Sequence, residues 1–124
     1  MNVIAVFVGG GLGSLLRFAV SEFSKKYFSL ALPYGTLICN LLSALIVGWL
    51  MALAVNTLKV SDTMKLLIVT GFCGGFSTFS AFSFETFQMM RNDQLLLAAA
   101  HVFISVAGCL LFIWAGWKLA STSF

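Results

Sequence analysis

Residues 70–85 of the chain read TGFCGGFSTFSAFSFE. Three glycines fall within five residues of this apolar stretch, and a run of hydroxyl and phenylalanine side chains follows them. Each glycine costs about 1 kcal/mol of helix propensity relative to alanine. Small residues also allow close helix packing in membranes, but a cluster in the middle of an apolar span favours a broken helix. Because lipid cannot pair the freed backbone groups, such a break must be buried in protein or line a polar cavity.

The rest of the chain is equally apolar. Its 124 residues are 60% hydrophobic and 9% charged, with a mean hydropathy of +1.04. A soluble domain this small needs polar residues to cover its surface, whereas a helix crosses a bilayer in roughly 20 apolar residues. We therefore expect an all-α integral membrane protein with one domain, residues 1–124. The four expected transmembrane helices are Val3–Phe23, Pro33–Thr57, Lys65–Met89 (broken at mid-membrane) and Leu95–Lys118.

Several other classes of protein are disfavoured by the same sequence. The first span lacks the basic start and small-residue exit of a cleavable signal peptide, so we interpret it as a retained helix. Cys39, Cys73 and Cys109 each fall inside a span and form no metal-ligand or disulfide pattern. The net charge of +3 comes from single basic residues at helix ends, which is not a nucleic-acid signal. With no nucleophile–base set or phosphate loop recognisable, we do not expect an enzyme.

Lysine and arginine are almost balanced between the two sides of the membrane. The two groups are Lys59, Lys65 and Lys118 on the side of the termini, and Lys25, Lys26 and Arg91 on the other side. Orientation follows this bias, so the sequence predicts insertion in both directions and pairing of two opposed copies about an in-plane two-fold axis. A weak bias hidden by misplaced span boundaries is the alternative.

Two phenylalanines of the third span are candidates for ion contacts. Phe79 and Phe82 lie three residues apart, on one face of a helix. Such a stripe is more often packing, but the edge of an aromatic ring is positive. Ring edges aimed into a pore would hold a small anion without a fixed positive charge. The same stretch offers hydroxyl donors at Ser77, Thr78, Ser80 and Ser83.

Polar side chains of the other spans complete the candidate set. Asn40 lies deep in the second span, where an amide is costly unless hydrogen-bonded, so it either joins two helices or donates its NH2 group to a solute. Arg17 is assigned to an aqueous vestibule, where a cation raises the local anion concentration. Glu85 sits towards a span end, which favours an interfacial or vestibule role over a proton relay. His101 is interpreted as a helix-packing residue.

Three motifs occur in order along the chain. They are Gly9-Gly10-x-x-Gly13-x-x-x-Arg17, Pro33-x-Gly35-Thr36-Leu37-x-x-Asn40, and Gly71-x-x-Gly74-Gly75-x-Ser77-Thr78-Phe79-Ser80-x-Phe82-Ser83-x-Glu85. In these motifs, in length and in number of spans, the chain resembles the bacterial fluoride exporters known as the Fluc or CrcB family. The resemblance covers nearly the whole chain, and its third motif is highly specific.

The resemblance implies a fluoride-selective channel of the bacterial plasma (inner) membrane. Members of the family export cytoplasmic fluoride by passive electrodiffusion through two pores of an antiparallel, dual-topology homodimer. The implied fluoride pore comprises Asn40, Phe79, Ser80, Phe82 and Ser83, with Arg17 and Glu85 at charged positions that we assign to the vestibule. A structural sodium ion at the dimer centre is implied as well, held by the backbone carbonyls of Gly74 and Ser77.

The chain departs from the family pattern at a few positions. Ala81 replaces a second Thr of the usual run, and fourth-span positions that often carry hydroxyl or amide groups are Ser105, Cys109 and Ile113. A thinner hydroxyl track leaves the conduction rate open and keeps a heterodimer with a paralogue as an alternative. Two further alternatives are a four-helix drug–proton antiporter, although the first span has no acid before Glu22, and a non-transporting helper protein.

Overall fold

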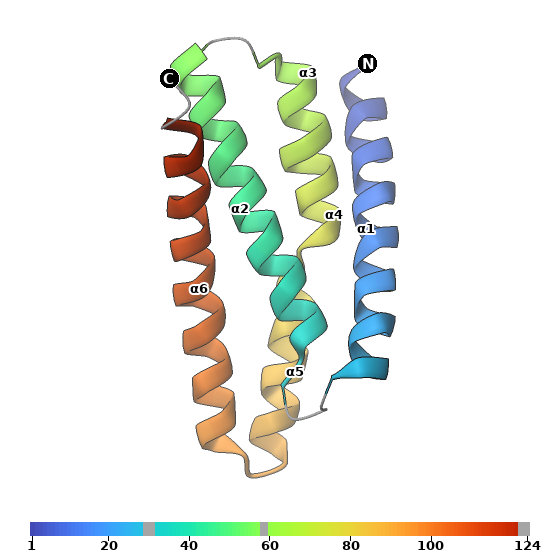
Figure 1. Ribbon diagram of the computed structural model, residues 1–124. Helices are drawn as coiled ribbons and strands as arrows, with labels where there is room; N and C mark the ends of the chain where they lie inside the picture. The colour runs from blue at the N-terminus through green and yellow to red at the C-terminus, as the bar shows by residue number, and fades with distance from the viewer. Residues whose placement is uncertain (29–31, 58–59, 122–124) are drawn as a thin grey trace.

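The computed structural model describes residues 1–28, 32–57 and 60–121, and these contain helices and no β-strand. The elements in order are α1 (Asn2–Tyr27), α2 (Tyr34–Thr57), α3 (Asp62–Lys65), the π-helical η1 (Leu66–Cys73), α4 (Gly74–Phe76), α5 (Phe79–Arg91) and α6 (Leu95–Ser121). Together, α3, η1, α4 and α5 form one interrupted span of 30 residues (Figure 1). All four spans are long and apolar enough to cross a membrane, which confirms the predicted fold class.

The four spans run alternately up and down. Figure 1 shows both termini at the end of the bundle where α2 leads into α3, with the other two connections at the opposite end. Lys65 and Lys118 occupy last turns at the end with the termini, whereas Lys25, Lys26 and Arg91 occupy last turns at the other. The predicted charge distribution therefore holds for these residues, while Lys59 lies outside the described residues.

The outer faces of the helices are apolar. Phe7 is 80% exposed, Leu96 86% and Phe103 72%. Large hydrophobic side chains in such numbers are stable on a surface only where lipid is the solvent.

Backbones approach closely at two contacts between spans. The first joins α1 to η1 and α4 of the third span, and the second joins α2 to α6. A Cβ atom built on Gly9 would lie 2.1 Å from the Leu67 carbonyl oxygen, and one on Gly48 would lie 2.1 Å from that of Ile113. Because only a hydrogen atom fits at these contacts, the glycines permit the close packing seen in membrane helices. Gly71 and Gly75, from the cluster that predicts the break, also face α1 in this way.

The predicted break in the third span is confirmed, two residues beyond the glycine cluster. Ser77 (φ −78°, ψ 159°) and Thr78 (φ −155°, ψ 114°) are extended, between the end of α4 at Phe76 and the start of α5 at Phe79. The break also changes the packing partner. The segment before it packs against α1, whereas α5 packs against α6 (Figure 1).

Removing one glycine at the α1 contact tests this packing. Gly9→Ala is expected to destabilise the protein by roughly 1–3 kcal/mol, because the added methyl group collides with backbone that cannot rotate away. Thermal unfolding in detergent measures the loss. Gly11→Ala is the matched control, since its Cβ would meet nothing within 4 Å and alanine favours the helix. Equal stability of the two variants would contradict the close approach.

Candidate functional site

One side chain from the neighbouring helix pairs with the backbone at the break. Asn40 of α2 accepts a hydrogen bond at its Oδ1 from the Thr78 backbone N–H at 2.8 Å, and its Nδ2 donates to the Thr78 carbonyl at 3.4 Å. The amide thus pairs both polar groups of one extended residue. This geometry accounts for the helix-joining role, and since an NH2 group carries two hydrogens, the second remains available for a solute.

The carbonyls of Gly74 and Ser77 are among those that lose their helical donors at the break. In a continuous helix the Thr78 N–H would donate to Gly74 and the Ala81 N–H to Ser77. Here the first N–H donates to Asn40, and the second donates to the Thr78 hydroxyl at 3.2 Å, which caps the start of α5. The carbonyls of Gly74 and Ser77 are thereby left for other partners, and they are the two carbonyls that the family resemblance singles out.

The carbonyls of Gly75 and Cys73, by contrast, have hydrogen-bond partners. The half-buried Arg17 of α1 donates from Nε to the Gly75 carbonyl at 3.0 Å. The Cys73 carbonyl accepts the Ser77 N–H at 2.8 Å and the Ser77 hydroxyl at 2.7 Å. Arg17 therefore ties α1 to the broken helix through the backbone, in addition to facing the cavity described below.

A groove of about 510 Å³ runs beside the break, between α2, the third span and α6. Asn40, Phe79 and Phe82 line it together, as do Gly74 and Ser77. No Asp, Glu, Lys or Arg of the described chain lines this groove. The three departures in the fourth span, Ser105, Cys109 and Ile113, line it too. The structure thus brings most of the predicted pore residues into one uncharged groove.

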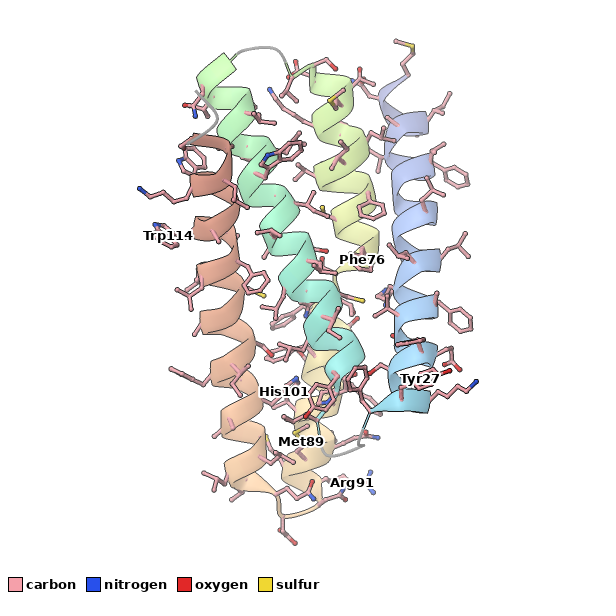
Figure 2. All side chains as sticks on the ribbon, in the orientation of Figure 1. Tyr27, Phe76, Met89, Arg91, His101 and Trp114 are labelled. Atoms are coloured by element: carbon pink, nitrogen blue, oxygen red, sulfur yellow. The ribbon has the colours of Figure 1, made fainter. Side chains whose placement is uncertain are left out.

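The two phenylalanines sit differently in this groove. Their ring centroids are 5.5 Å apart with planes tilted by 41°. Phe79 is 79% exposed, whereas Phe82 is half-buried and lies 5.0 Å from the His101 ring. His101 is 2% exposed, and its Nδ1 lies 3.0 Å from the Thr86 hydroxyl. The imidazole therefore packs between α6 and α5 (Figure 2), in agreement with the packing role expected for it.

A second cavity, of about 480 Å³, adjoins the first. Arg17 and Glu85 both line it, and Thr78 lines both cavities, so the break separates them. Within it the buried Thr36 hydroxyl donates to Glu85 Oε1 at 2.6 Å. Thr36 is not among the candidate residues predicted from the sequence, although its hydroxyl lies inside the second motif and inside a span.

Two predicted pore residues fall outside this arrangement. The Ser80 hydroxyl lies 3.2 Å from the Thr78 hydroxyl, and Ser83 lies one turn further along α5. Neither is among the residues that line the two cavities in the described part of the chain. Ala81, the departure in the third motif, lines the cavity of Arg17 and Glu85.

Comparison with known proteins shows which family the chain belongs to. The sequence model described as "CrcB-like protein, Camphor Resistance (CrcB)" matches residues 4–117. A protein of Clostridium perfringens named "Fluoride-specific ion channel FluC" is 40% identical over 121 residues, 98% of this chain and 94% of its own length. Proteins of the same name from Citrifermentans bemidjiense (40% over 119 residues, 96% of each chain) and Methanococcus aeolicus (38% over 115 residues, 93% and 91%) are similar. The chain belongs to the CrcB family.

Proposed function

We propose that this chain is a fluoride-selective channel that lets cytoplasmic fluoride leave the cell by passive electrodiffusion. The observation that carries the proposal is the uncharged groove in which Asn40, Phe79 and Phe82 meet beside a helix break. Relatives that match almost the full chain are named fluoride-specific ion channels, and the groove has the chemistry that a small anion needs.

The donors proposed for fluoride in this groove carry partial rather than full positive charges. The edges of the Phe79 and Phe82 rings are positive, and the second hydrogen of the Asn40 amide is a donor. The start of α5 adds the positive end of a helix dipole at the level of Thr78. Partial charges stabilise the ion without the tight binding that a buried lysine or arginine would impose, and conduction requires the ion to leave as well as enter.

The second cavity is proposed as the vestibule. Arg17 and Lys25 line it and attract anions from solution. Glu85 is engaged by Thr36 at 2.6 Å, which directs one carboxylate oxygen towards α2. Because Thr78 borders both cavities, an ion that enters at Arg17 passes the break before it reaches the phenylalanines.

We propose further that two copies pair in opposite orientations, as a homodimer with two pores in the bacterial plasma membrane. The nearly balanced lysine and arginine distribution supports insertion in both directions. Phe79 is 79% exposed and Gly74 is exposed beside an open groove, and a second copy would cover them. This pairing is the two-chain analogue of inverted repeats in transporters.

A sodium ion at the dimer centre is proposed on the chemistry of the break. Sodium takes oxygen ligands, and unwound carbonyls supply them in other membrane proteins. The carbonyls of Gly74 and Ser77 have lost their helical donors to Asn40 and Thr78, so the residues present fit such an ion. Pairing of the Gly75 carbonyl with Arg17 removes that carbonyl from the candidate ligands.

Fluoride efflux from liposomes that contain the purified chain alone tests the function. A fluoride electrode should record fast, protein-dependent release after the charge is balanced with a potassium ionophore, and chloride release should stay at the level of empty liposomes. Absence of fluoride release from protein that elutes as a folded dimer would contradict the proposal as stated for a single gene product.

Replacing one ring tests the aromatic contact. Phe82→Ile is expected to lower fluoride efflux roughly fivefold, because an edge-on aromatic interaction worth about 1 kcal/mol is lost and isoleucine has no positive edge. The dimer should persist in size-exclusion chromatography. Phe84→Ile is the control, since Phe84 lies on the same helix, is 61% exposed and lines neither cavity. Full efflux from Phe82→Ile would remove the ring from the ion path.

A negative charge at position 40 tests whether Asn40 contacts the ion as well as supporting the break. Asn40→Asp keeps an oxygen for the Thr78 N–H, so the variant should fold. Its efflux should fall at least tenfold, because a negative charge about 4 Å from the ion costs about 4 kcal/mol at an effective dielectric constant of 20. Asn56→Asp adds the same charge near the exposed end of α2 and should conduct normally. Normal efflux from a folded Asn40→Asp protein would limit Asn40 to supporting the break.

A further inference from the structure

Three hydroxyl groups of this chain pair with the backbone one turn earlier. Ser77, Thr86 and Ser121 donate to the carbonyl four residues before them, at 2.7, 2.8 and 2.9 Å. Ser43 of α2 differs, because its hydroxyl is buried and has no hydrogen-bond partner among the described residues. The side chain is only 4% exposed. A buried hydroxyl without a partner is unfavourable, so it calls for a ligand.

The place of Ser43 indicates which ligand that is. It lines the groove that holds Phe79 and Phe82, and it follows Asn40 by three residues, on the same face of α2. Its neighbours along the groove wall include the apolar Ala44, Val47 and Val106. Asn40 and Ser105 are further polar residues of the same lining. A hydroxyl hydrogen that rotates freely is suited to an ion that has shed part of its water.

We propose that Ser43 is an anion-binding residue of the groove, donating its hydroxyl hydrogen to fluoride next to Asn40. The inference rests on the proposed fluoride conduction and adds a second donor on α2, beside Asn40. Ser105 of α6 has an unpartnered hydroxyl as well, but it occupies one of the fourth-span positions already considered. Ser43 lies outside the three motifs that carry the family resemblance.

Three substitutions at one position test the donor. Ser43→Ala removes the hydroxyl and is expected to lower fluoride efflux roughly tenfold, because a hydrogen bond to a charged group is lost. Ser43→Cys keeps a similar size but is a weak donor, so its efflux should fall as well. Ser43→Thr keeps the hydroxyl and should retain most of the wild-type efflux. The melting temperature of Ser43→Ala should equal or exceed that of wild type, because no protein partner is lost.

The controls separate this inference from the function on which it rests. Ser121→Ala removes a hydroxyl that pairs with Trp117 at the end of α6 and should leave efflux unchanged. If Ser43→Ala conducts fluoride as fast as wild type, the role of Ser43 is overturned, whereas the proposed channel function still stands. A loss of efflux in Ser43→Thr as large as in Ser43→Ala would also overturn it, because side-chain size would then be responsible. Absence of efflux from wild type would instead reject the proposed channel.

Discussion

A helix that breaks inside a bilayer must find new partners for its backbone groups, because lipid offers none. In this chain the requirement is met at Thr78 by Asn40 of α2, which pairs both the backbone N–H and the backbone carbonyl of that residue. The Thr78 hydroxyl then caps the start of α5, and Arg17 pairs with the Gly75 carbonyl. The positions of both cavities depend on this set of contacts, since the break borders each of them.

One break produces two kinds of electrostatic site. The first half of the interrupted span ends in carbonyls, which carry the negative end of its dipole, and the second half begins with amides, which carry the positive end. Gly74 and Ser77 are thereby suited to a cation, and the groove at Phe79 and Phe82 to an anion. The glycine contacts of α1 hold the first half while α5 packs on α6, so the two halves diverge. This divergence opens the uncharged groove for which we propose fluoride conduction.

Much of this architecture is predictable from the sequence, and the remainder depends on helix placement. The absence of charged residues over long windows locates the four spans, and the glycines locate the break to within a few residues. Pattern alone cannot show that Gly71 and Gly75 face α1, or that Asn40 reaches Thr78, because both depend on how the helices cross. The hydrogen bond between Thr36 and Glu85, which lie 49 positions apart in the sequence, also depends on how the helices cross. Ser80 and Ser83 share the motif of Phe79 but are not among the residues that line the groove, which the motif alone does not reveal.

Amide hydrogen exchange at Thr78 in lipid nanodiscs tests most directly the claim that Asn40 holds the break. In wild type this amide should exchange slowly although it lies outside any helix, because it donates to Asn40. In Asn40→Ala it should exchange roughly tenfold faster, as expected for loss of the hydrogen bond to Asn40, while the Gln88 amide within α5 keeps its rate. Equal rates at Thr78 in the two proteins would contradict the account, because the break would then persist without the side chain assigned to hold it.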